Sequence, residues 1–220
     1  MAAAGFLRAS ASDMLRYLEI FRTGGKVGEC RILQPESVAA MTACHAPCDL
    51  GVYYGYGLMV VPDRGGVTLI EHGGAVKGVA AHMVAVPERD LTAVALANVA
   101  GAPSPRITVG AVNAYLGLPC DAPRVEHPDH EGGSDGLDAL AATYRSEEGA
   151  SIGIEVEDGR LVAVMGGERQ KARRVGERAF AVPFRGGEMV LRFSMLDGDP
   201  CVTFGYRVLR RTPASAEAAS

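Results

Sequence analysis

The sequence predicts an α+β fold, in which an antiparallel sheet with flanking helices is followed by a small all-β barrel or sandwich. Three observations lead to this prediction. The first half mixes helical spacing of apolar residues with short apolar runs bounded by turn residues. The second half shows alternation with a period of two over several hairpins. Between them lies a stretch rich in proline and glycine.

The 220 residues suffice for one large or two small domains. We expect a first domain over residues 1–118 and a linker over 119–136, which holds three prolines and three glycines and shows no period. A small lipocalin-like β-barrel is expected over 137–212. The small and polar residues of 213–220 are expected to form a disordered tail.

Three helices are expected in the first domain. Ser10 or Ser12 can cap the first, and Gly24-Gly25 stops it. Pro35 suits the first turn of a second helix. The third spans Arg106–Leu116 and would pack on the sheet. The apolar positions of the first helix have a one-sided spacing, at Met14, Leu15, Leu18 and Phe21. In the second helix, Val38 and Met41 are expected to face inward.

Four strands are expected between the second and third helices, at Gly57–Val61, Val67–Glu71, Ala80–Val86 and Leu91–Ala97. Each is short and is separated from the next by turn residues, so successive antiparallel pairing is the simplest topology.

The second domain is predicted to be almost wholly β after one short helix, Leu137–Tyr144. Asp158-Gly159 indicates a hairpin. A later turn at Asp197–Asp199 joins two alternating runs. The first run holds Met189, Leu191, Phe193 and Met195, and its partner strand is expected to hold Val202, Phe204, Tyr206 and Val208.

Composition excludes several classes of function. The net charge of −4 implies no broad basic face, so nucleic acid and anionic membranes are poor partners. No apolar run approaches the roughly 18–20 residues of a membrane span. The first eight residues lack the features of a signal peptide, so a cytoplasmic protein is expected if Met1 is the true start.

The polar clusters do not indicate a metal or cofactor. The five cysteines are odd in number and form no CxxC pair, so buried free thiols are expected. His127 and His130 lie beside acidic residues in the linker, which we interpret as solvated rather than as a metal site. No cofactor and no metal are expected.

His72-Gly73-Gly74 follows the apolar run Val67–Glu71. A polar side chain at the end of a strand, followed by two glycines, allows another molecule to approach the backbone closely. Bare N–H groups at such a strand can hold a carbonyl oxygen as it becomes an oxyanion. The alternative is a strand that ends in a glycine turn with one half-buried histidine.

Residues from about Ala4 to Leu118 resemble the carboxy-terminal part of the serine β-lactamase and DD-peptidase superfamily, on its class C-like and esterase-like side. The second domain resembles the small β-barrel appended to D-aminopeptidase-like members. The stretches that carry the first resemblance are Ala4–Leu18, Ile32–Val38, Tyr56-Gly57-Leu58, His72-Gly73-Gly74 and Val86–Leu91.

The resemblance implies a role for each residue of the third family motif, Lys-Thr-Gly or its His-x-Gly variant. His72 would orient the substrate and polarise the nearby proton-transfer network. Gly73 and Gly74 would border the substrate and permit its close approach. The backbone N–H of Ala75 would be one of two oxyanion donors.

The other two family motifs are absent. The family nucleophile is the serine of Ser-x-x-Lys, but the residues three positions before the three lysines are Thr23, Gly74 and Glu168. Tyr-x-Asn and Ser-x-Asn are missing too, because Leu96 and Ala111 precede the two asparagines by two positions. The chain is therefore expected to be the carboxy-terminal portion of a longer hydrolase, with no nucleophile of its own and no activity alone.

No replacement nucleophile is predicted. Ser10 and Ser12 are better explained as helix caps, and there is no G-x-S-x-G elbow. His45 is adjacent in sequence to Cys44 and close to Cys48, but no second signature supports a nucleophile–base pair.

Three hypotheses of function remain. The first is the carboxy-terminal part of a serine hydrolase that cleaves an amide or ester of a small molecule or peptide. Its partner would be the missing amino-terminal half, and without it the chain is expected to self-associate. The second is a non-catalytic module that binds a ligand or partner. The third is a truncated product without a function of its own.

Overall fold

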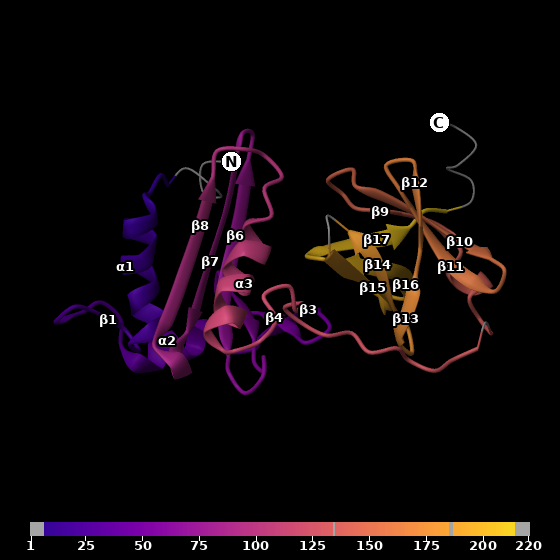
Figure 1. Cartoon of the computed structure of the whole chain (residues 1–220). Coiled ribbons are helices and arrows are strands. Elements are labelled where there is room, and N and C mark those ends of the chain that lie inside the picture. The colour runs from indigo at the N-terminus through magenta and orange to yellow at the C-terminus, as the bar shows by residue number, and fades with distance from the viewer. Residues whose placement is uncertain (1–6, 134, 185–186, 214–220) are drawn as a thin grey trace. The chain divides into compact units, whose positions relative to one another are not determined.

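The computed structural model describes residues 7–133, 135–184 and 187–213 (Figure 1). The chain forms two compact units. The first takes the residues up to Pro47 and Gly51–Val125, and the second takes Cys48–Leu50 and the residues from Glu126 on. The division after Val125 falls within the stretch expected to be a linker. Except for Pro213, the tail expected over 213–220 lies outside the described residues. No helix in the described part has the length and apolar character needed to cross a membrane.

Helices α1 and α2 begin at the residues that the sequence marks, and α1 also ends there. Helix α1 spans Ala11–Arg22, and the side chains of Ser10 and Asp13 form a capping box at its start. Gly24 follows the end of α1 with a φ of 68°. Helix α2 is Pro35–Met41, with Pro35 in its first turn. Helix α3 is Ser104–Tyr115, two residues longer at its start than expected.

The first unit contains a six-stranded sheet in the order β3-β4-β5-β6-β7-β8, and the four predicted strands form its β5–β8 part. These four pair antiparallel in sequence order, as predicted. Strands β1–β4 were not predicted, because two to four residues are too few to show alternation. The bounds are β1 Lys26–Val27, β2 Cys30–Arg31, β3 Ala46–Asp49, β4 Val52–Tyr54, β5 Met59–Val61, β6 Leu69–Val76, β7 Val79–Val86 and β8 Leu91–Ala97, with a 3-10 turn at Pro87–Arg89.

The helices cover both faces of this sheet (Figure 1). Ile70, Met83 and Ala85 share one face, because successive side chains of a strand alternate. They pack in one core with residues of α1 and α2. Helix α3 contacts β7 and β8 on the other face, where His82 lies against Thr108. The buried residues of the core are Leu18, Phe21, Val38, Leu58, Ile70, Met83 and Ala85.

The second unit is one nine-stranded antiparallel sheet that curls into a nearly closed barrel. Its strand order is β12-β11-β10-β9-β17-β16-β15-β14-β13. The bounds are β9 Ala142–Arg145, β10 Ser151–Glu157, β11 Arg160–Met165, β12 Glu168–Lys171, β13 Arg173–Gly176, β14 Ala179–Phe184, β15 Gly187–Leu196, β16 Asp199–Phe204 and β17 Arg207–Arg211.

The helix predicted over Leu137–Tyr144 is wrong. Only Asp138–Leu140 form a 3-10 turn, which we label η3, and Ala142–Arg145 is strand β9, paired with β10 and β17. Pairing on both edges buries Tyr144 in the barrel, and this tertiary burial outweighs the helical spacing of a short segment. The hairpin at Asp158-Gly159 is confirmed, with φ values of 50° and 70°.

The partner strand expected to hold Val202 to Val208 is also interrupted. Strand β16 ends at Phe204, a turn occupies Gly205 and Tyr206, and β17 starts at Arg207. Gly205 has a φ of 59°, which no extended strand allows. The apolar alternation runs through the turn, so it could not reveal the break.

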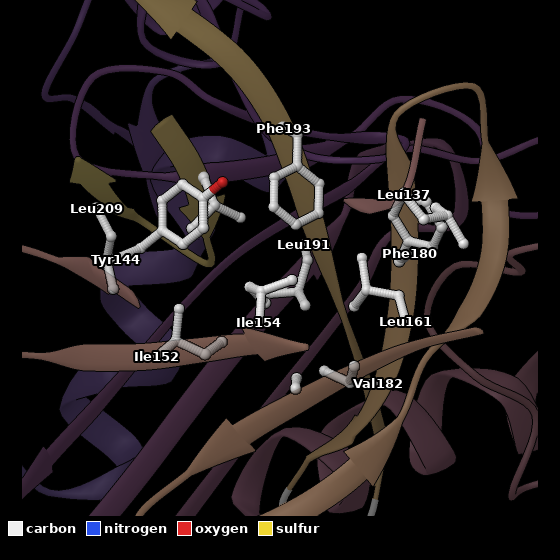
Figure 2. Close-up of a cluster of buried hydrophobic side chains, with 12 residues drawn as sticks. Leu137, Tyr144, Ile152, Ile154, Leu161, Phe180, Val182, Leu191, Phe193 and Leu209 are labelled. Carbon is white, nitrogen blue, oxygen red and sulfur yellow. The ribbon is translucent and has the colours of Figure 1, made fainter. Parts of the chain in front are cut away.

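Figure 2 shows the barrel core, in which side chains from the surrounding strands gather in one interior cluster. The rings of Tyr144 and Phe180 each meet that of Phe193 edge to face, with centroids 5.8 Å apart in both pairs. The core residues are Leu137, Tyr144, Ile152, Ile154, Leu161, Ala163, Phe180, Val182, Leu191, Phe193, Val202 and Leu209.

Candidate functional site

His72, Gly73 and Gly74 lie inside strand β6 and do not close it. The predicted strand ended at Glu71, but β6 continues to Val76. Gly73 pairs with His82 and Gly74 with Ala81, so the two glycines continue the ladder with β7. Neither has a positive φ. The expected strand end at Glu71 and the alternative of a glycine turn are therefore both wrong, since an extended glycine pairs through its backbone like any other residue.

The side chain of His72 lies on the sheet face that carries α1 and α2. It is half-buried and is paired across the ladder with Met83, one of the residues of that core. Its Nε2 atom lies 3.0 Å from the hydroxyl oxygen of Tyr54, from the end of β4. The two rings meet edge to face. The hydrogen bond holds the imidazole in one orientation at the edge of the helix-covered core.

The N–H group of Ala75 points away from β7. A two-residue turn, Lys77-Gly78, joins β6 to β7, with Gly78 at a φ of 82°. Such a turn closes on a hydrogen-bonded pair, here Val76 and Val79, and pairs then alternate along the ladder. The neighbouring pair, Ala75 with Ala80, is therefore of the non-hydrogen-bonded kind.

Strand β5 does not reach Ala75 on the other side. The residues of β6 that pair with β5 are Leu69, Ile70 and Glu71. Among the described residues, no strand pairs with the edge of β6 from His72 onward, where Ala75 directs its N–H, and Ala75 itself is exposed. A bare backbone donor beside an imidazole is an arrangement that can hold a developing oxyanion.

The two glycines meet different surroundings. A Cβ atom on Gly74 would find no atom within 4 Å, and Gly74 is exposed on the His72 face. A Cβ atom on Gly73 would lie 3.2 Å from Cδ2 of His82. Gly74 thus leaves open space beside His72, whereas Gly73 leaves room for a buried histidine behind the strand.

A buried polar cluster lies on that opposite face. Glu71 is fully buried and forms an ion pair with Arg124 through its Oε1 atom. Nδ1 of His82 lies 2.6 Å from Oγ1 of Thr108. Because Thr108 donates its own hydroxyl proton to the carbonyl of Pro105, it accepts the proton of His82 Nδ1. In the neutral ring, Nε2 then carries no proton.

The facing atoms of Glu71 and His82 are unsatisfied. His82 Nε2 lies 3.8 Å from Glu71 Oε2, and within the described chain neither atom has a hydrogen-bond partner. Burial lowers the pKa of His82, although the nearby Glu71 carboxylate acts in the opposite direction. The strand that carries His72 is therefore backed by a buried carboxylate and a neutral imidazole.

Sequence reasoning missed this cluster. Its one visible signal was a charged residue and a histidine, Glu71 and His82, inside otherwise apolar strand runs. Arg124 gave no signal at all, because it belongs to the stretch predicted to be a linker.

Two of the residues considered as an alternative nucleophile or base have other partners. Ser10 caps α1, and His45 binds the carbonyl of Ala40 and stacks on Tyr56. Cys48 and Cys201 are buried as expected, but Cys30, Cys44 and Cys120 are exposed. The expectation of buried thiols was wrong for these three because they lie in short strands and loops at the surface. Within the described residues, no three His, Cys, Asp or Glu side chains gather as metal ligands.

The chain belongs to the β-lactamase family. The family model for β-lactamase matches residues 1–115. This confirms the resemblance drawn from the motifs, and the α+β architecture of the first unit agrees with it. No curated protein sequence matches the chain significantly.

Two solved structures share the fold over nearly the whole chain. SurE in complex with D-Leu is 22% identical, covers 96% of this chain and has a TM-score of 0.68. A second SurE structure is 21% identical, covers 93% and has a TM-score of 0.63. An octameric penicillin-binding protein homologue from Pyrococcus abyssi is 19% identical, covers 92% and has a TM-score of 0.49. The chain spans about half the length of these proteins, at 52%, 48% and 47%.

Proposed function

We propose that this chain is the carboxy-terminal part of a serine hydrolase of the β-lactamase family that cleaves an amide or ester. It supplies one wall of the cleft, formed by His72, Gly73, Gly74 and Ala75. A Ser-x-x-Lys segment that precedes it, or that another chain carries, supplies the nucleophile and the proton acceptor.

The observation that carries this proposal is the open edge of β6 beside His72. Ala75 directs its N–H away from β7 where β5 has ended, and Gly74 leaves space for a substrate next to it. The hydroxyl of Tyr54 holds the imidazole of His72, on the same strand, in one orientation. A carbonyl that binds along this edge would meet a preorganised donor, which stabilises the charge of the transition state.

The substrate class is an amide or ester of a small molecule or short peptide. Because SurE is described in complex with D-Leu, the p-nitroanilide and methyl ester of D-leucine are the first substrates to test, with their L-leucine counterparts beside them.

The test expresses the chain alone and joined to the coding sequence directly upstream, and measures hydrolysis of both substrate pairs. We expect turnover only from the joined product. His72→Ala should lower its kcat/KM by about 100-fold, the lower end of the effect of a proton-transfer group. Ala75→Pro, which removes the outward N–H, should lower kcat by about 100- to 1,000-fold.

Ala75→Gly is the matched control, because it keeps the backbone donor and should keep kcat within a few fold. Equal rates from the joined product and its His72→Ala and Ala75→Pro variants would contradict the proposal. Turnover by the chain alone would also contradict it.

A non-catalytic binding function is the second candidate. The observation in its favour is a cavity of the barrel, whose lining includes no residue of the proposed cleft wall. One protein can have both functions, and binding of a ligand in the cavity is tested separately.

A further inference from the structure

The barrel contains a cavity of about 480 Å³, a size typical of sites for small organic ligands. It lies among the turn η3, the β13–β14 turn and the β15–β16 hairpin. Every residue that lines it belongs to the second unit. Residues of the barrel core form part of its wall, namely Leu137, Tyr144, Phe180 and Phe193.

The apolar part of the wall is packed into the barrel core. Phe180, Phe193 and Tyr144 pack edge to face in the core (Figure 2). The hydroxyl of Tyr144 donates to the carbonyl of Leu140 at 2.9 Å. Burial raises the pKa of Tyr144, so the hydroxyl stays protonated and neutral. Aromatic surface of this kind binds an aliphatic or aromatic group without a change of conformation.

Three arginines line the polar part of the cavity, and two of them have structural partners. Arg174 donates to the carbonyls of Gly133, Gly176 and Glu177. Arg211 donates to the carbonyls of Ala139 and Ala141. These bonds use three of the five N–H donors of Arg174 and two of those of Arg211, but a neutral carbonyl does not cancel the positive charge.

Arg178 is different. It is exposed beside the cavity, and within the described residues its side chain makes no hydrogen bond or ion pair. The acidic residues of the lining are Asp135 and Glu177, and in the described part of the chain neither forms an ion pair with an arginine of the cavity. The lining therefore carries three positive and two negative charges, with one guanidinium available for a ligand.

We propose that this cavity binds a small monocarboxylate with an apolar group. The carboxylate pairs with Arg178, whose planar fork of donors matches two carboxylate oxygens. The apolar group lies against Phe180 and Phe193. A fatty acid and an N-acylated apolar amino acid both have this chemistry. This inference does not depend on the proposed hydrolase activity, since binding requires no turnover.

The test is calorimetric titration of the full chain with octanoate and with N-acetyl-L-phenylalanine. We expect saturable binding of at least one of them. Binding of octanoate alone assigns the site to fatty acids, and binding of N-acetyl-L-phenylalanine alone assigns it to acylated amino acids or peptide ends. The neutral amide of each bound probe should bind at least tenfold more weakly, because it lacks the charge that Arg178 recognises.

Arg178→Gln should weaken binding at least tenfold without lowering the thermal stability, since the side chain forms no hydrogen bond or ion pair with the described residues. Arg178→Lys should retain part of the affinity. Arg160→Gln is the matched control, because it removes the same charge from strand β11, outside the cavity. No binding of either probe at 10 mM, equal binding of the amides, or unchanged affinity in Arg178→Gln would each overturn the proposal.

Discussion

Gly73 and Gly74 are neighbours in β6, but their side-chain positions face different surroundings. The position of Gly73 is 3.2 Å from the ring of His82, which is buried and bound to Thr108 at 2.6 Å and cannot easily move away. The position of Gly74 is open. The two glycines are therefore required for different reasons, one for packing and one for access.

We expect Gly73→Ala to lower the free energy of unfolding by about 1–3 kcal/mol, the usual cost of overpacking. Gly74→Ala should change it by about 0.5 kcal/mol or less, as at an open surface position. Urea denaturation of the two variants measures the difference. If Gly74→Ala proved the more destabilising change, the described packing of His82 behind Gly73 would be wrong.

His82 makes the stability depend on pH. Its pKa is lowered in the folded chain, so below about pH 6.5 the unfolded chain binds a proton that the folded chain does not. Stability is then lost as the pH falls through this range. We expect the wild type to lose up to about 1.4 kcal/mol per pH unit relative to His82→Gln between pH 6.5 and 5.5.

Unfolding in urea at pH 7.5, 6.5 and 5.5 checks this expectation. His130→Gln is the control, because it removes an exposed imidazole, and it should follow the wild type. Parallel pH profiles of the wild type and His82→Gln would show that His82 does not cause the loss of stability at low pH.

At the scale of elements, the hairpin β6–β7 extends past the end of β5. This extension is what opens the edge of β6 at Ala75, and it depends on the register of the ladder rather than on any side chain. Hydrogen-bonded and non-hydrogen-bonded pairs alternate along the ladder, so the N–H of Gly74 points towards β7 and the N–H of Ala75 points towards the open side.

Proline substitution distinguishes these two directions. We expect Gly74→Pro to destabilise the chain by about 1–3 kcal/mol more than Ala75→Pro, because only the first leaves a ladder carbonyl without its donor. Thermal unfolding measures both variants. An equal loss of stability would mean that Ala75 also donates within the ladder and is not available to a substrate.

The length of each sequence pattern decided whether the element could be predicted. Helices α1 and α2 were predicted from their caps and their spacing, and β7 and β8 from continuous apolar runs. The extension of β6 was missed because two glycines look like a turn until β7 is known to pair with them. Arg124 and Tyr54 joined the site only through tertiary contacts, which the sequence does not record.

At the scale of the molecule, the His72 face continues into an exposed apolar area. Gly74, Ala81 and Leu96 form one row across β6, β7 and β8, and Val76 and Val79 follow on the same face. Val76, Val79 and Leu96 are 59%, 41% and 46% exposed. Apolar side chains grouped in this way favour contact with another protein surface.

We expect the chain alone to self-associate at micromolar concentration through this area. Burial of apolar surface contributes roughly 25 cal/mol per Å², so a few hundred Å² supply several kcal/mol. Leu96→Lys should shift the sedimentation profile towards the monomer. Ile107→Lys, at a similarly exposed position on α3, should not. A monomeric wild type that excludes an apolar dye would contradict this expectation.

We propose that this chain holds the cleft wall and that the nucleophile lies elsewhere. Intact mass after incubation with a fluorophosphonate probe distinguishes the two, because the probe adds a fixed mass to an activated serine. We expect an unchanged mass for the chain alone, and one adduct, on the serine of Ser-x-x-Lys, when the upstream segment is joined to it. A stoichiometric adduct on any serine or cysteine of the chain alone would contradict it.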